Sequence, residues 1–136
     1  DLIFPNYTEA CYLTDTAYKA GGITLNEARE LLDKLHAIGS KSVLITSICI
    51  EGQHCVVGFN HTTGEYFELP YTEIPVRFPG TGDIFSAVLI GHLLDDEPLN
   101  KATQKAMDVV YHFIDLNKDN IDKNRGIPIE NYLDLI

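Results

Sequence analysis

The chain has 136 residues and a formal net charge of −10. This length suits a single domain with an ordinary core. The acidity excludes sequence-independent binding to nucleic acid, which needs a basic surface to neutralise backbone phosphates. No apolar run approaches the roughly 20 residues that a membrane-spanning helix needs, so we expect no contact with a membrane.

The first apolar run, Leu2-Ile3-Phe4, is typical of a buried strand. It begins directly after the first residue, so we expect the chain to be part of a longer one. Asn6 follows this strand and is a good N-cap, and Glu9 stands three residues later, as in a capping box. A functional interpretation is equally compatible, because open α/β sheets bind ligands at the carboxyl ends of their strands. There Glu9 would help to hold Mg²⁺ through water.

A helix is predicted next. Thr24 and Glu27 form a second capping box, and Gly39 is expected to end the helix as its C′ residue. The apolar residues that share one face of this helix are Leu25, Ala28, Leu31, Leu32, Leu35 and Ile38. The run 42–46 that follows is β-branched and nearly continuous, as in a strand covered on both faces. Thr46 and Ser47 then come after a strand, where their hydroxyls are either turn formers or phosphate ligands.

The next two apolar runs, 55–59 and 65–69, flank the segment 60–64, whose composition is that of a hairpin turn. Later in the chain, one apolar helix is expected to end near Pro98, and a last helix to span about 100–118. The residues that mark the buried face of this last helix are Ala102, Ala106, Val109, Val110, Phe113 and Ile114. The order of elements predicts an α/β fold, with helices on a mostly parallel sheet and an antiparallel hairpin at one edge.

The most informative motif is Pro79-Gly80-Thr81-Gly82-Asp83, which opens the apolar helix that follows it. Glycines let backbone N–H groups converge on an anion, and the positive end of a helix favours the charge of a phosphoryl group. An aspartate at this place can accept a proton from a hydroxyl group. The alternative is a simple glycine turn in which Asp83 caps the helix.

Other familiar sites do not fit the sequence. Phe85 stands where the third glycine of a dinucleotide-binding fingerprint belongs, and no P-loop motif occurs. Neither the zinc pattern suggested by His54, Cys55 and His61 nor the calcium pattern that begins at Asp115 has the required spacing. Three cysteines without a C-x-x-C pair suit reduced thiols, which indicates a cytoplasmic location.

With these motifs in order, the sequence resembles the carboxyl-terminal half of the ribokinase-like (PfkB) superfamily, and within it the pyridoxal/pyridoxamine kinases. The residues that carry the resemblance are 5–10, Thr46-Ser47 and 76–86. It implies a three-layer fold and ATP-dependent phosphorylation of the hydroxymethyl group of a B6 vitamer (pyridoxal, pyridoxamine or pyridoxine), in a homodimer. Residues 1–136 would be the nucleotide-binding part of the kinase domain, without its amino-terminal half.

The resemblance also implies roles for single residues. Asp83 would be the catalytic base, and Gly80, Thr81 and Gly82 would form the anion hole. The residues expected to bind ATP are Asn6, Thr46, Ser47, Val76 and Phe78, the last two at the adenine, and Glu9 would serve Mg²⁺. Related hydroxymethylpyrimidine kinases usually carry cysteine at the position of Asp83, so the aspartate favours the pyridoxal kinases. It leaves a sugar or nucleoside kinase, or a non-catalytic nucleotide-binding module, as alternatives.

Members of this superfamily are about twice as long as this chain. The part that is absent would supply the first strands, the lid and most of the vitamin pocket. We therefore expect that these 136 residues alone do not phosphorylate pyridoxal.

Overall fold

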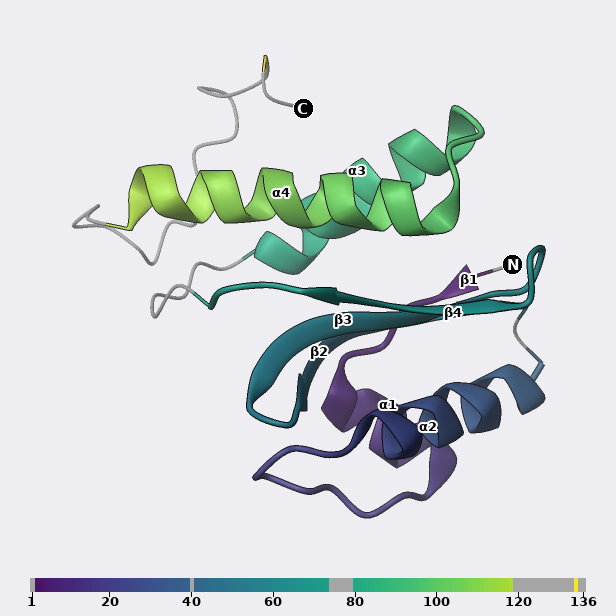
Figure 1. Ribbon diagram of the computed structural model, residues 1–136. Helices are drawn as coiled ribbons and strands as arrows, with labels where there is room; N and C mark the ends of the chain where they lie inside the picture. Colours follow the sequence, from purple (N-terminus) through teal and green to yellow (C-terminus); the bar gives the residue numbers. More distant parts are fainter. Residues whose placement is uncertain (1, 40, 74–79, 119–133, 135–136) are drawn as a thin grey trace. The chain divides into compact units, whose positions relative to one another are not determined.

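The computed structural model describes residues 2–39, 41–73, 80–118 and 134. They fall into two compact units, residues 1–73 and 74–136, and each is described by itself (Figure 1). The first unit contains β1 (Leu2–Ile3), α1 (Tyr7–Thr14), α2 (Leu25–Ala37), β2 (Ser42–Ile50), β3 (Gln53–Asn60) and β4 (Glu65–Pro70). The second contains α3 (Thr81–Leu94) and α4 (Leu99–Asn117). No helix within the described ranges is long and apolar enough to cross a bilayer.

The four strands form one mixed sheet in the order β1-β2-β3-β4. β1 and β2 pair in parallel, with Leu2 opposite Ser42, and the other two pairs are antiparallel. The expected hairpin of β3 and β4 lies at one edge. The antiparallel part is larger than expected, because β2 continues to Ile50 and turns back into β3 through Glu51 and Gly52. Both residues have positive φ, 51° and 84°, as the tight turns of hairpins require.

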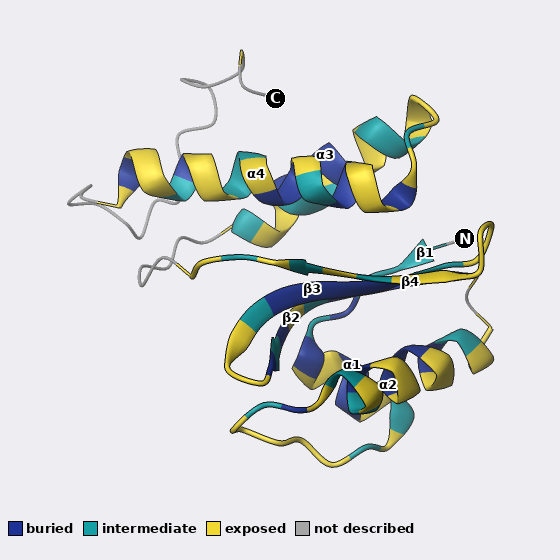
Figure 2. Cartoon of the chain, viewed as in Figure 1, coloured by how far each residue is buried: buried dark blue, intermediate teal, exposed yellow. Residues whose placement is uncertain are grey.

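The core of the first unit lies between the sheet and the pair α1 and α2. The inner sides of both helices are buried and their outer sides are exposed (Figure 2). In α2 the buried residues are Ala28, Leu31, Leu32 and Leu35, and the capping box of Thr24 and Glu27 is present, as the sequence predicts. All three cysteines are free thiols, and burial raises the pKa of Cys55 to about 11.

The second unit is a pair of helices, α3 and α4, that pack against each other. Ala102, Ala106 and Phe113 are buried on α4, in agreement with the predicted face. In the turn between the helices, Glu97 forms ion pairs with Lys105 of α4 and with His92 of α3, the latter at 2.7 Å. Lys105 and then His92 hold the pKa of Glu97 below its ordinary value. The turn is therefore fixed by contacts of Glu97 with both helices.

Candidate functional site

The amino-terminus of α1 is closed by a capping box. The Glu9 N–H donates to Asn6 Oδ1 at 2.8 Å, and the Asn6 N–H donates to Glu9 Oε2 at 2.9 Å. The structural interpretation of this pair is thus confirmed. The capping box is also compatible with the functional interpretation, because Glu9 is exposed and its Oε1 has no bonding partner in the described part of the chain. One carboxylate oxygen caps the helix, and the other is available to a ligand.

The backbone brings Thr46 beside the turn that leads from β1 into α1. The Thr46 N–H donates to the Pro5 carbonyl oxygen at 3.0 Å. Pro5 directly precedes Asn6, so Asn6 and Thr46 both lie just beyond the residues through which β1 and β2 pair in parallel. The structure thus brings Thr46 next to the turn that holds Asn6, and the role of these residues in binding a ligand stays a prediction.

The prediction that Thr46 and Ser47 follow a strand is wrong, because they lie inside β2. Ile45 is opposite Val57 and Ile48 is opposite Cys55, so Thr46 and Ser47 together face the single residue Val56. This is the two-to-one count of a β-bulge. The strand continues beyond the bulge because its buried residues resume at Ile48 and pair with β3.

Tyr71 belongs to the same neighbourhood and was missed by sequence reasoning. Burial raises the pKa of the Tyr71 phenol, and the nearby Ser47 side chain lowers it to a smaller extent. Tyr71 directly follows β4, two strands away from Ser47 in the sheet. Nothing local in the sequence marks it, since its place near Ser47 depends on the register of three strands.

The glycine motif forms the amino-terminus of α3 in the second unit. Gly80 is the N-cap residue, with a φ of 85°, and no side chain caps the helix. Asp83 lies in the first turn and is exposed, so the alternative in which it caps the helix does not hold. Apart from its chain neighbours and the backbone of α3 itself, no described residue has a heavy atom within 4 Å of the place where a Cβ would stand on Gly80 or Gly82. The first-turn N–H groups are thus accessible to an anion.

The predicted site residues are divided between the two units. Asn6, Glu9 and the bulge residues Thr46-Ser47 are in the first, and 80–83 are in the second. Val76 and Phe78 lie outside the described residues. Within the described ranges no cluster of three or more His, Cys, Asp or Glu side chains could hold a metal ion. An ion at Glu9 would take most of its ligands from water and nucleotide, which suits Mg²⁺.

The model of the phosphomethylpyrimidine kinase family matches residues 1–128. The chain belongs to this family. Among curated relatives, the pyridoxal kinase of Arabidopsis thaliana is 35% identical over 97 residues, which are 66% of this chain and 29% of the relative.

Two solved structures show the same fold. A proposed phosphomethylpyrimidine kinase of Bacteroides thetaiotaomicron VPI-5482, crystallised with pyridoxal, has a TM-score of 0.88 and 34% identity over 99% of this chain and 49% of its own. The pyridoxal kinase of Leishmania donovani, in complex with ADP and ginkgotoxin, has a TM-score of 0.76 and 26% identity over 98% of this chain and 47% of its own. The α/β, ribokinase-like fold is therefore established, and the chain spans about half the length of these structures, and less of the plant enzyme.

Proposed function

We propose that the complete protein to which this chain belongs transfers the γ-phosphoryl group of ATP to the hydroxymethyl group of pyridoxal, pyridoxamine or pyridoxine. The observation that carries the proposal is the amino-terminus of α3. Its first-turn amides have no side-chain cap, and an exposed carboxylate, Asp83, stands in that same turn. Amides and a base at one helix end are what the transfer of a phosphoryl group to a hydroxyl requires.

In the proposed reaction, the acceptor oxygen attacks the γ-phosphorus, a new O–P bond forms, and the bond to the leaving ADP breaks. The hydroxyl proton passes to the Asp83 carboxylate. The N–H groups of residues 80–82 and the positive end of α3 stabilise the negative charge of the group in transfer. Gly80 and Gly82 carry no Cβ, so a phosphate can approach the backbone closely.

The first unit would bind the rest of the nucleotide. Glu9 Oε1 would meet a water of hydrated Mg²⁺, and the ion, when bound, offsets the charge of the phosphates. Asn6 and the Thr46-Ser47 bulge would contact the triphosphate, and Val76 with Phe78 would line the adenine. These roles rest on the resemblance and, for Glu9 and Ser47, also on their exposure. A cytoplasmic homodimer is part of the same proposal.

A second candidate is the phosphorylation of a hydroxymethylpyrimidine, which the matched family favours by its name. The aspartate at position 83, where such kinases usually carry cysteine, supports the B6 vitamers instead. A sugar or nucleoside kinase and a non-catalytic nucleotide-binding module are the remaining alternatives.

The test is a substrate panel on the complete protein with ATP and Mg²⁺. Pyridoxal, pyridoxamine, hydroxymethylpyrimidine and ribose are compared by the rate of ADP release and by the mass of the phosphorylated product. We expect the highest kcat/KM with a B6 vitamer. A higher value with hydroxymethylpyrimidine would establish the second candidate. Calorimetric binding of ATP without turnover of any acceptor would indicate a non-catalytic module.

A further inference from the structure

Two histidines from different elements of the first unit lie side by side. His36 is in the last turn of α2, and His61 begins the turn that joins β3 to β4. Their imidazole rings are 5.6 Å apart between centroids. The sequence suggests a zinc pattern of His54, Cys55 and His61, but the first two stand at the far end of β3. The fold makes His36 the neighbour of His61 instead.

The carbonyl group of Lys41 determines which ring nitrogen of His36 carries the proton. Nδ1 of His36 lies 2.8 Å from the Lys41 carbonyl oxygen. A carbonyl oxygen only accepts, so Nδ1 donates, and Nε2 of the neutral ring keeps its lone pair. Histidines that bind metals are commonly oriented in this way, with the second ring nitrogen donating to a carbonyl or carboxylate oxygen. The ring also packs against Phe59, with 4.9 Å between centroids, so its orientation is fixed from two sides.

The backbone at His61 is fixed as well. Its N–H donates to Ser42 Oγ at 3.1 Å. In the turn that follows, the Gly64 N–H donates to the Asn60 carbonyl oxygen at 2.8 Å, and the Thr62 N–H donates to Asn60 Oδ1 at 3.0 Å. Neither ring nitrogen of His61 has a hydrogen-bond partner among the residues that the structure describes. The neutral ring therefore offers a nitrogen lone pair to a ligand.

The separation of the two rings suits one metal ion bound by both. Zn²⁺ binds imidazole nitrogen at about 2.0–2.1 Å in tetrahedral geometry, which places the centroids of two bound rings about 5 to 5.5 Å apart. The observed 5.6 Å is close to this separation. Imidazole nitrogen suits first-row transition metals, whereas Mg²⁺ prefers oxygen ligands. Water completes the coordination, since no cluster of three or more His, Cys, Asp or Glu side chains occurs in the described ranges.

We propose that His36 and His61 form a binding site for a divalent transition-metal ion such as Zn²⁺, with His36 bound through Nε2. The site is separate from the role of Glu9 toward Mg²⁺, and it does not depend on the proposed function. The bound ion joins the carboxyl-terminal end of α2 to the turn between β3 and β4. It therefore stabilises the folded first unit, as any ligand does that binds only the folded state.

Calorimetric titration of the complete, untagged and metal-free protein with Zn²⁺, in an excess of Mg²⁺, tests this inference. We expect H36Q and H61Q each to weaken Zn²⁺ binding by at least about tenfold, because even a group that only orients a metal ligand contributes about that much. The double variant should bind little more weakly than either single variant, since one imidazole alone does not chelate the ion. Zn²⁺ should also raise the melting temperature of wild type more than that of either variant.

H112Q is the matched control. His112 is exposed on α4 in the second unit, so the substitution removes one accessible imidazole outside the proposed site. It should leave the affinity for Zn²⁺ unchanged. An equal loss in H112Q, or wild-type affinity in both H36Q and H61Q, would overturn the inference, as would the absence of Zn²⁺ binding by the wild-type protein. Because His61 is exposed in a turn, H61Q decides the test even if H36Q does not fold.

Discussion

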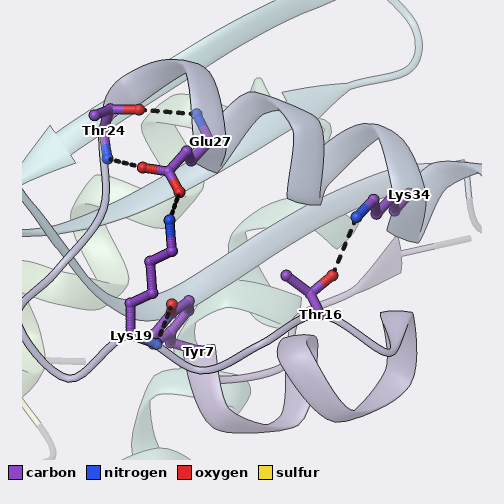
Figure 3. Close-up of polar contacts among 6 residues, drawn as sticks. All are labelled: Tyr7, Thr16, Lys19, Thr24, Glu27 and Lys34. Carbon is purple, nitrogen blue, oxygen red and sulfur yellow. Dashed lines mark hydrogen bonds and ion pairs between the residues drawn. The ribbon is translucent and has the colours of Figure 1, made fainter.

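Three of the helices that the structure describes carry a carboxylate at the third helical position, and the three carboxylates are engaged to different degrees. Glu27 of α2 uses both oxygens: Oε1 accepts from the Thr24 N–H at 3.2 Å, and Oε2 pairs with Lys19 (Figure 3). Glu9 of α1 uses only Oε2, for the Asn6 N–H. Asp83 of α3 caps nothing, because its N-cap residue is Gly80 and no side chain caps that helix.

The number of bonded oxygens distinguishes a carboxylate that stabilises the fold from one that is a candidate for catalysis or metal binding. Lys19 binds Glu27 and also donates its backbone N–H to the Tyr7 hydroxyl at 3.1 Å, so the loop between α1 and α2 is tied to both helices. Lys34 holds the same loop by donating to Thr16 at 3.3 Å (Figure 3). A carboxylate with both oxygens engaged stabilises a fold, while a free one can take a proton or a cation.

The largest effect on activity is expected at Asp83, the carboxylate of the three that caps no helix. D83N in the complete protein should lower kcat by about 10² to 10⁴, because a positioned base contributes about that much. The melting temperature should change little, since Asp83 is exposed and makes no cap. Steady-state kinetics and thermal unfolding check both parts.

E27Q serves as the control, because it removes a carboxylate from the same helical position of α2. It should keep kcat within about threefold of wild type, since Glu27 belongs to the scaffold. A D83N variant that retained turnover within about tenfold of wild type would remove Asp83 from the role of base.

The comparison also shows what the sequence could and could not predict. Both capping boxes and the apolar face of α2 depend on spacing within one helix, and they were predicted correctly. The hairpin of β3 and β4 was predicted from equally local features of the sequence. The Lys19–Glu27 pair was not predictable, because Lys19 stands in an irregular loop whose path is set by its contacts with Tyr7 and α2.

The bulge in β2 could not be predicted for a similar reason. In the sequence, Thr46 and Ser47 look like the end of a strand, because two polar residues follow an apolar run. Whether such a strand ends or continues depends on its pairing with β3, which is a non-local contact. The same register places Tyr71 beside Ser47, so the misplaced strand end and the missed residue have one cause.

The intermediate member of the series, Glu9, should affect the metal and leave the fold intact. In E9Q the amide oxygen can still accept from the Asn6 N–H, but the charge is lost. We expect the Mg²⁺ concentration for half-maximal activity to rise by about tenfold, as is typical for groups that hold a metal through water. The melting temperature should stay close to that of wild type.

E27Q should show the reverse, with unchanged Mg²⁺ dependence and a lower melting temperature, because Lys19 loses its partner. Titration of activity with Mg²⁺ and thermal unfolding of both variants give the comparison. If E9Q requires the same Mg²⁺ concentration as wild type, Glu9 serves only as a helix cap and does not hold the metal.

The smallest expected effect is the pH dependence of the fully engaged carboxylate. Lys19, followed by the Thr24 N–H, holds the pKa of Glu27 below its ordinary value of 4.5. A depressed carboxyl pKa stabilises the folded state above the unfolded pKa, and this contribution is lost as the pH falls through the lowered value. The contribution of Glu27 should therefore be full at pH 6 and decline below about 4.5. It should be small, because the pair is exposed and screened by salt.

Hydrogen exchange at the first turn of α2, measured on the complete protein at several pH values and corrected for intrinsic rates, detects it. Protection should fall with acid in wild type. In K19M the fall should be weaker, since the pKa of Glu27 returns toward its ordinary value when its largest cause is removed. An equal fall in both proteins would mean that the capping bond alone, without Lys19, governs this helix end, and that Glu9 and Glu27 differ less than their contacts indicate.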